Sequence, residues 1–384
     1  MWSLRWVLVL AVSLTLCSGV FSQVSPRVVD RSFQRPSARA LGLGGAYLLL
    51  TDDASAVLWN PAALAHTKRF TFPIDLTGRA NFDVLDVPDL VDSLEAIRDQ
   101  TDVADAAAVR AAIRSAYEEV KRFAAEHPRM RASLTPVTGL SWGGYGLAVT
   151  TGVVLQLDTA VNAADPFRVG ALPVADNLYF RGGAIAVTSA AVGYGHVFPA
   201  GLTLGGSIRW VRADFAGFLA GASLDPAAAD PVLGTDFPQV NENAFTLDVG
   251  AIYEPPIQPP QWRIRYAGVV RNLWPAELDL GVVRGIDMSF RLNPEVDLGA
   301  VAEWKGGRTL GVLELHNVTG ANGGDLSIHA GIEHWMGSVF AVRVGWDDDK
   351  PVLGLGVDLG VLRLDLAAGL KPQERLAVGL SLRF

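Results

Sequence analysis

Apolar and polar residues alternate through most of the chain from about residue 69. The last such segment shows this most clearly, because Leu376, Val378, Leu380, Leu382 and Phe384 alternate with Arg375, Ala377, Gly379, Ser381 and Arg383. A period of two places all the apolar side chains on one face of a β-strand. The other face carries small residues and sparse charges, whereas a soluble β-sandwich is rich in Lys, Glu and Thr on its polar face. The pattern favours a transmembrane β-barrel with aliphatic side chains toward lipid.

Fourteen segments of this kind follow one another, and their connections alternate in length. The segments span residues 69–82, 131–142, 145–158, 183–197, 201–215, 244–254, 262–272, 294–304, 308–317, 325–335, 338–346, 352–359, 361–370 and 375–384. Transmembrane barrels have short periplasmic turns and longer outer loops. The first connection, 83–130, is long, the second, Gly143-Gly144, is short, and the next eight continue the alternation. We therefore predict an all-β fold, an antiparallel barrel of about 14 strands at residues 69–384 with both termini in the periplasm.

The first outer loop, residues 83–130, has a different pattern. Pro88 suits the first position of a helix, and Val109, Ile113 and Tyr117 recur at helical spacing. We expect a helical extracellular loop, which acts either as a lid or docking element at the barrel mouth or as a passive cap on its rim.

Composition excludes several classes of protein. The chain is 50% hydrophobic and 19% charged, which rules out intrinsic disorder. After the first twenty or so residues, no run of about 18 apolar residues occurs, because charged residues interrupt every apolar stretch. A membrane-spanning helix is therefore not expected. The net charge of −8 argues against nucleic acid as a partner.

The N-terminus has the features of a signal peptide. Arg5 precedes an apolar core at residues 6–16, and Val20 and Ser22 occupy the small-residue positions of a cleavage site after residue 22. We expect export through the Sec pathway, removal of residues 1–22 and residence in the cell outer membrane. The single cysteine, Cys17, would leave with the signal, so no disulfide is expected.

Residues 23–68 precede the first strand and do not alternate. Glycines that permit tight turns or close approach to a wall come first, a pair of acidic residues that can cap a short helix follows, and an Asn-Pro pair gives a second capping signal. The residues concerned are Gly42, Gly44, Gly45, Asp52, Asp53, Asn60 and Pro61, with Trp59 between the two helices. They predict a compact unit of two short helices. Because such short helices are marginal in water, the unit needs a barrel wall to pack against.

The same segment resembles the N-terminal hatch of the FadL/OmpP1-like outer-membrane proteins. That family shows an Ala-Leu-Gly-x-Gly-Gly-Ala stretch, then Asp-Asp-Ala-Ser, then Trp-Asn-Pro-Ala, which are found here at residues 40–46, 52–55 and 59–62. The resemblance implies a 14-stranded barrel whose N-terminal hatch, residues 23–68, plugs the lumen. It also implies passage of hydrophobic molecules, as in fatty-acid uptake. The helical first loop looks more like the PorV-like and conjugal TraF-like branches.

Two functions therefore stay open. The first is a passive outer-membrane channel for hydrophobic, fatty-acid-like molecules; the second is a PorV/TraF-like secretion or assembly factor whose outer loops dock an exported protein. No histidine belongs to a nucleophile, H-E-x-x-H or metal-binding arrangement, so we expect no enzyme, no catalytic residue, no metal and no cofactor. Outer-membrane lipid is an expected partner. So is the barrel-assembly machinery, through a terminal signal at Leu380, Leu382 and Phe384.

Overall fold

The computed structural model describes most of the chain from residue 37 onward. The described ranges are 37–67, 69–80, 129–162, 177–223, 233–234, 239–279, 282–283, 286–287, 290–304, 308–348, 350–369 and 374–384, with Ala96, Ala108, Ala111, Ser115, Glu118, Glu119 and Arg122 as single residues. The expected signal peptide, residues 23–36 of the expected hatch and nearly all of the helical loop at 83–130 lie outside the described residues.

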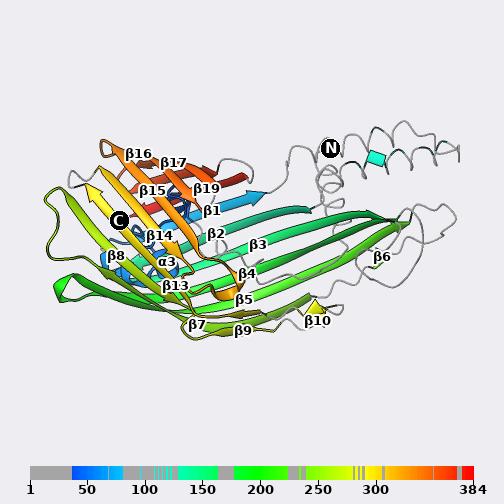
Figure 1. Cartoon of the computed structure of the whole chain (residues 1–384), viewed down its shortest axis with the longest axis horizontal. Helices are drawn as coiled ribbons and strands as arrows, with labels where there is room; N and C mark the ends of the chain where they lie inside the picture. The colour runs from blue at the N-terminus through cyan, green and yellow to red at the C-terminus, as the bar shows by residue number, and fades with distance from the viewer. Residues whose placement is uncertain are drawn as a thin grey trace.

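Fourteen strands close into one antiparallel barrel (Figure 1). They are β1 (Thr71–Ala80), β2 (Arg129–Trp142), β3 (Tyr145–Asn162), β4 (Asn177–Val197), β5 (Leu202–Ser223), β7 (Gln239–Tyr253), β8 (Trp262–Arg271), β13 (Glu295–Trp304), β14 (Thr309–His316), β15 (Ser327–Met336), β16 (Phe340–Asp347), β17 (Lys350–Asp358), β18 (Leu362–Gly369) and β19 (Glu374–Arg383). Each pairs with the next of these strands, and β1 pairs with β19 to complete the ring. The predicted barrel of about 14 strands is confirmed.

The two faces of the wall differ as the alternation predicted. On β19, Leu376 and Val378 are exposed on the outside, whereas Ala377 faces inward and is buried. Leu364 on β18 is 40% exposed, although it is a large aliphatic residue. Such residues recur around the barrel, and a continuous exposed apolar band of this kind is the surface that lipid covers in a transmembrane barrel. Among the described residues, no helix has the length and apolarity needed to span a membrane.

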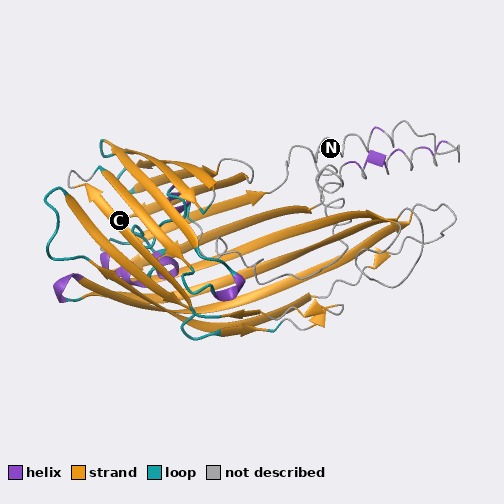
Figure 2. Cartoon of the chain, in the orientation of Figure 1, coloured by secondary structure: helices purple, strands orange, loops and turns teal. Residues whose placement is uncertain are grey.

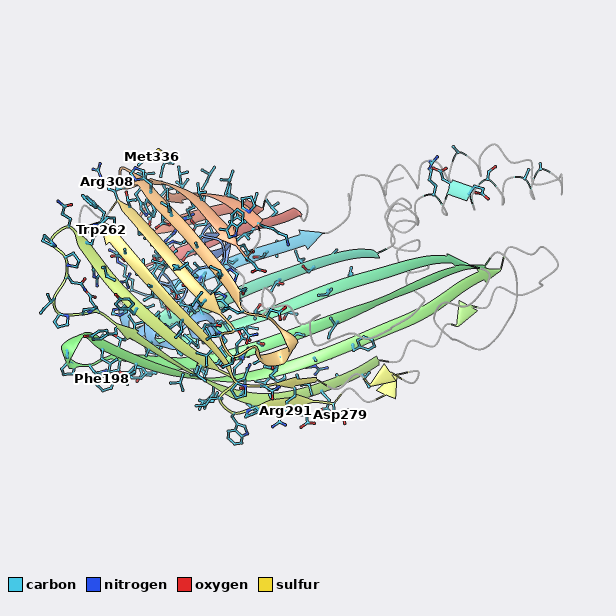
Figure 3. All side chains as sticks on the ribbon, in the orientation of Figure 1. Phe198, Trp262, Asp279, Arg291, Arg308 and Met336 are labelled. Carbon is cyan, nitrogen blue, oxygen red and sulfur yellow. The ribbon has the colours of Figure 1, made fainter. Side chains whose placement is uncertain are left out.

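Aromatic side chains gather at the end of the barrel that carries the short turns. A chain of ring contacts runs there from β2 across β3 and β4 to the turn before β5 and consists of Trp142, Tyr145, Tyr194, His196 and Phe198. Trp262 and Trp304 meet edge to face with ring centroids 4.9 Å apart. In Figure 3, Phe198, Trp262, Arg308 and Met336 mark this end of the molecule, and Figure 1 places the C-terminus there as well. An aromatic belt is expected where a barrel meets the membrane interface.

Several short elements complete the fold (Figure 2). Helices α2 (Ala38–Gly42) and α3 (Ala56–Trp59) and the 3-10 helix η3 (Pro61–His66) precede the barrel. Strand β6 (Leu233–Gly234) pairs with β5, β9 (Ala276–Leu278) pairs with β12 (Phe290–Leu292), and β10 (Val282–Val283) pairs with β11 (Ile286–Asp287). The 3-10 turns η4 (Pro199–Gly201) and η5 (Ala321–Gly323) lie in connections.

The main departure from the predicted strands is the length of β3, β4 and β5. These strands reach Asn162, Asn177 and Ser223, several residues beyond the predicted ends at 158, 183 and 215. They continue to pair with one another past the region of clear alternation. Backbone hydrogen bonds can extend a hairpin past the residues whose types alternate, so the sequence pattern underestimates its length. Figure 1 shows these strands projecting beyond β14 to β19.

Candidate functional site

Residues 37–67, here called the inner segment, pack against the inward faces of the barrel strands. Helix α2 contacts β16 to β19, and η3 contacts β4, β5 and β7. The segment is buried almost throughout, and three of its leucines, Leu43, Leu48 and Leu64, have no exposed surface. Figure 1 places α3 behind the front strands of the barrel. A segment this short owes its burial to the wall around it, not to a core of its own.

Local capping explains the path of the inner segment. Gly44 and Gly45 have φ angles of 71° and 85°, so the chain turns back after α2 in a conformation that glycine adopts freely. Asp53 Oδ1 accepts hydrogen bonds from the backbone N–H and hydroxyl of Ser55, at 2.8 and 2.6 Å. Asn60 Oδ1 accepts the N–H of Ala62 at 3.1 Å, with Pro61 as the first residue of η3. Asn60 and Pro61 thus begin η3 as residue type and order predict, whereas Asp53 does not cap α3 and bonds instead to Ser55, the residue that precedes this helix.

The small residues of the inner face have a specific use. A Cβ at Gly205 on β5 would lie 2.4 Å from the backbone N of Ala62, and one at Gly345 on β16 would lie 2.2 Å from the backbone N of Gly44. Similar backbone approaches occur at Gly331 and Gly195. The wall is therefore glycine-rich where the main chain of the inner segment lies directly on it.

A buried ion network joins α2 to the barrel wall. Arg39 of α2 donates two hydrogen bonds to the carboxylate of Glu333 on β15, at 3.0 and 2.7 Å. Arg343 on β16 donates to the same carboxylate at 2.6 Å and lies 2.8 Å from Asp365 on β18. Glu333 and Arg343 have no exposed surface. A carboxylate buried this deeply is retained only with such charge-assisted partners.

Asp52 is the second anchor of the network. Its Oδ2 lies 3.0 Å from Arg383, 3.3 Å from Arg363 and 3.5 Å from Arg39. Burial alone would raise the pKa of Asp52, but these three guanidinium groups outweigh it and hold the pKa below its usual value. Burial, and then the charge of Asp52, raise the pKa of the neighbouring Asp53. Asp52 is thus paired with cations, whereas Asp53 caps a turn.

Two further wall residues bind the backbone of the inner segment. Arg271 on β8 donates to the carbonyls of Leu58 and Trp59 at the end of α3, and its Nε lies 2.9 Å from Asp297. Glu314 on β14 accepts the N–H of Leu48 at 2.6 Å. A cation at the end of a helix and an acceptor at a free N–H satisfy groups that would otherwise be buried without partners.

The eight residues expected to form the hatch all lie in the inner segment: Gly42, Gly44, Gly45, Asp52, Asp53, Trp59, Asn60 and Pro61. Among the arginines of the wall, Arg363 contacts Asp52. Three others pair with wall carboxylates: Arg343 contacts Glu333 and Asp365, and Arg263 and Arg265 contact Glu303. Of the terminal residues, Phe384 is 66% exposed on the outside.

Sequence reasoning missed Arg39, Arg271, Glu314, Glu333 and Arg383 as site residues. The last four occupy inward positions of alternating segments, so charge on an otherwise small-residue face is the signal that could have found them.

A second part of the inner wall is apolar. Along the inner face of β5, Ser207 contacts the inner segment, Arg209 follows, and Val211, Ala213 and Phe215 come next. Val211, Ala213 and Phe215 belong to a buried hydrophobic cluster that also contains Val154, Ile185, Val187, Ala276, Leu278 and Leu292. We call its six wall residues on β3, β4 and β5 the apolar patch; Ala276, Leu278 and Leu292 belong to the β9–β12 hairpin that packs on it. In the described part of the chain, no group of three or more His, Cys, Asp or Glu side chains is placed to hold a metal ion.

Comparison with known proteins gives likenesses among solved structures alone. No protein-family model matches the chain, and no curated protein does. The toluene transporter TbuX of Ralstonia pickettii matches at 12% identity with a TM-score of 0.48, over 92% of this chain and 99% of that one. A FadL homologue of Pseudomonas aeruginosa matches at 11% identity with a TM-score of 0.46, over 91% and 98%. At these identities the likeness concerns the fold alone.

Proposed function

We propose that the protein is an outer-membrane channel that lets hydrophobic molecules pass through its barrel, with the inner segment as its hatch. The observation that carries the proposal is the apolar patch on the inner wall of β3, β4 and β5. The lumen of a water-filled barrel channel is polar, because water and hydrophilic solutes have to be accommodated there. An inner wall lined by apolar side chains such as Val187, Val211 and Phe215 suits an apolar cargo instead.

The inner segment supplies the closure that such a channel needs. Fourteen strands enclose a wider lumen than the eight that side chains alone can fill. Ion pairs from Arg39 and Asp52 and the bonds from Arg271 and Glu314 hold the segment in the lumen at several separate points. We infer that it blocks free diffusion of hydrophilic solutes while the barrel is at rest.

The cargo is an apolar molecule of the hydrocarbon or fatty-acid type. TbuX is a toluene transporter, and the motif of residues 40–62 resembles that of fatty-acid channels, so both classes are candidates. The secretion-factor alternative depends on the loop at 83–130, and no feature of the described residues favours it. Export through the Sec pathway and insertion by the barrel-assembly machinery stay predictions.

Uptake by a Gram-negative host that lacks its own channel of this type tests the proposal. Cells that express the protein should take up radiolabelled toluene or oleate faster than cells with an empty vector. Uptake of a labelled disaccharide should not change. The matched variants are Val211→Glu, which puts a charge on the apolar patch, and Val137→Glu, which puts one on the inner wall beside the inner segment. Uptake that is no faster than in the empty-vector cells would overturn the proposal.

A further inference from the structure

We propose that the β9–β12 hairpin occupies the place of the hydrophobic ligand on the apolar patch and has to lift before the ligand binds there. This inference rests on the proposed function. The hairpin is the inward-packed part of the connection between β8 and β13, which is one of the longer outer loops that the alternation of connection lengths predicts. Ala276, Leu278 and Leu292 from the hairpin pack with residues of the inner wall, and Leu278 has no exposed surface.

The hairpin has two unlike faces. Leu278 and Leu292 point to the wall, whereas Glu277 and Arg291, which are opposite each other in the pairing, are exposed. In Figure 3, Asp279 and Arg291 of this region lie away from the end marked by Phe198 and Met336. The apolar face of the hairpin suits contact with the wall. Its charged face suits contact with water, also when the hairpin is detached.

The root of the hairpin is a break in the wall. Between the last β8–β13 pair and the first β9–β12 pair there are four residues, 272–275, on one strand and two, 293–294, on the other. Unequal lengths of this kind bend a hairpin out of the plane of its sheet. Asn272 and Asn322 both donate to the carbonyl of Asn293, at 3.3 and 3.2 Å, and Asn293 N–H donates to Asn322 Oδ1 at 2.6 Å.

This root lets the hairpin move as a unit. Asn272 and Asn322 have φ angles of 50° and 58°, a left-handed conformation that asparagine tolerates and most residues do not. Thr246 on β7 also holds the root, because its hydroxyl donates to the carbonyl of Trp274 at 2.8 Å. Backbone and side-chain bonds from Leu247 and Asp248 on β7 hold Leu273 and Asn272 at the same root. Farther along, Ala276, Leu278 and Leu292 pack on the wall through apolar contacts. A hydrophobic ligand offers the wall the same kind of contact, so it can replace the hairpin with little net change in buried apolar area.

A single-cysteine accessibility experiment on the refolded full-length chain in detergent tests the lifting. With Cys17→Ser as background, Val211→Cys places the reporter under the hairpin, and Val137→Cys places a matched control under the inner segment. Both valines are 1% exposed. Asn322→Gly keeps the left-handed backbone but removes the bonds to Asn293, and Leu278→Ser weakens the wall contact.

We expect Asn322→Gly and Leu278→Ser each to accelerate the labelling of Val211→Cys by N-phenylmaleimide about tenfold. The labelling rate of Val137→Cys should stay within about twofold of its starting value. Leu278→Ser should also tighten binding of the fluorescent compound N-phenyl-1-naphthylamine, which competes with the hairpin for the wall. An unchanged rate at position 211, equal acceleration at both positions, or weaker binding of the compound would overturn the proposal. If the labelling rates change as expected but cells that express the protein take up no hydrocarbon, the lifting of the hairpin is supported and the transport function is contradicted.

Discussion

Asp52 Oδ2 lies 3.0 Å from Nη2 of Arg383, which joins the inner segment to the last barrel strand across 331 residues of sequence. Arg383 in turn lies 3.2 Å from Asp358 at the end of β17. The contact therefore ties the inner segment to the strands that form the closing seam of the barrel. Ion pairs confined in this way hold a register more than they add stability.

Replacing the two adjacent acids should have unequal effects. Asp52→Asn leaves three guanidinium groups without their shared anion, and we expect a loss of about 1–2 kcal/mol, because the Asp52 side chain is 43% exposed and partly screened. Asp53→Asn should be near neutral, because the raised pKa of Asp53 shows that its charge is disfavoured and an amide oxygen can still accept from Ser55. Denaturant titration of the refolded protein at neutral pH measures both.

The pH dependence of the same pair gives an independent check. Because the folded-state pKa of Asp52 is lowered, its contribution to stability is present above its ordinary pKa and disappears as the pH falls through the lowered value. The raised pKa of Asp53 acts in the opposite sense, since the folded state binds this proton first as the pH falls. Asp52→Asn should therefore flatten the acid limb of the stability curve; an unaltered limb would contradict the assignment.

The fully buried carboxylate of Glu333 should matter more than an exposed one. Glu333→Gln removes the buried anion that Arg39 and Arg343 share, and we expect a cost of about 3 kcal/mol, the lower end for a broken buried pair, because Arg343 keeps Asp365 and Arg39 keeps Asp52. Glu254→Gln breaks a pair with Arg263 that is about half exposed, and should cost at most about 1 kcal/mol. Equal losses in unfolding titrations would show that burial of the network is not what determines its energy.

The strands could be predicted, but the partners inside the barrel could not. Alternation is a local signal, so the order and the faces of the segments follow from residues close in sequence, as Leu376 and Ala377 illustrate. The pairing of Arg39 with Glu333 joins residues 294 apart, and it depends on the strand register and on the curvature of the closed ring. Capping by Asn60 could be predicted because it is local as well: its side chain accepts the N–H of Ala62, two residues further along the chain.

The inward fold of the β9–β12 hairpin was out of reach of sequence reasoning as well. Its strands are three residues long, and a pattern of that length does not separate a strand from a loop. The break at its root depends on the left-handed backbone of Asn272, which residue type permits but does not require.

Removing Phe384 should impair closure of the barrel. Phe384 and Phe70 exchange backbone hydrogen bonds at 2.9 and 3.2 Å, and their rings lie 6.3 Å apart at the end of the β1–β19 seam. We expect deletion of Phe384 to lower the fraction of protein that runs in the compact form on unheated gels, whereas Phe384→Tyr should retain it. A compact fraction equal to that of the intact chain would refute a role of this residue in assembly.

A charge on the outer face should be costly. Leu364→Arg places a cation where lipid is expected, at an estimated loss of about 2–4 kcal/mol at mid-depth, and Leu364→Ala is the control for the lost side chain. Ala367 is not a useful inward control, because it is buried with Ala38 and Leu41 of α2, so a large residue there would collide with the inner segment. Refolding into lipid vesicles measures the difference, and equal losses for both Leu364 variants would mean that this face does not meet lipid.

Glycines under the inner segment should be intolerant of a methyl group. In Gly205→Ala the new Cβ would lie 2.4 Å from atoms of Pro61 and Ala62, and because these are backbone atoms the inner segment has to move. Overpacking of this kind costs about 1–3 kcal/mol. Gly311→Ala on β14 is the matched control, since a Cβ there meets no atom within 4 Å.

Both positions lie in barrel strands, so both variants should keep the strand content of the parent in circular dichroism. Gly205→Ala should raise single-channel conductance in planar bilayers, because a displaced inner segment no longer fills the lumen. Conductance that stays at the parent level in Gly205→Ala, with the loss of stability present, would mean that the segment can move without opening a path and would contradict its role as the hatch.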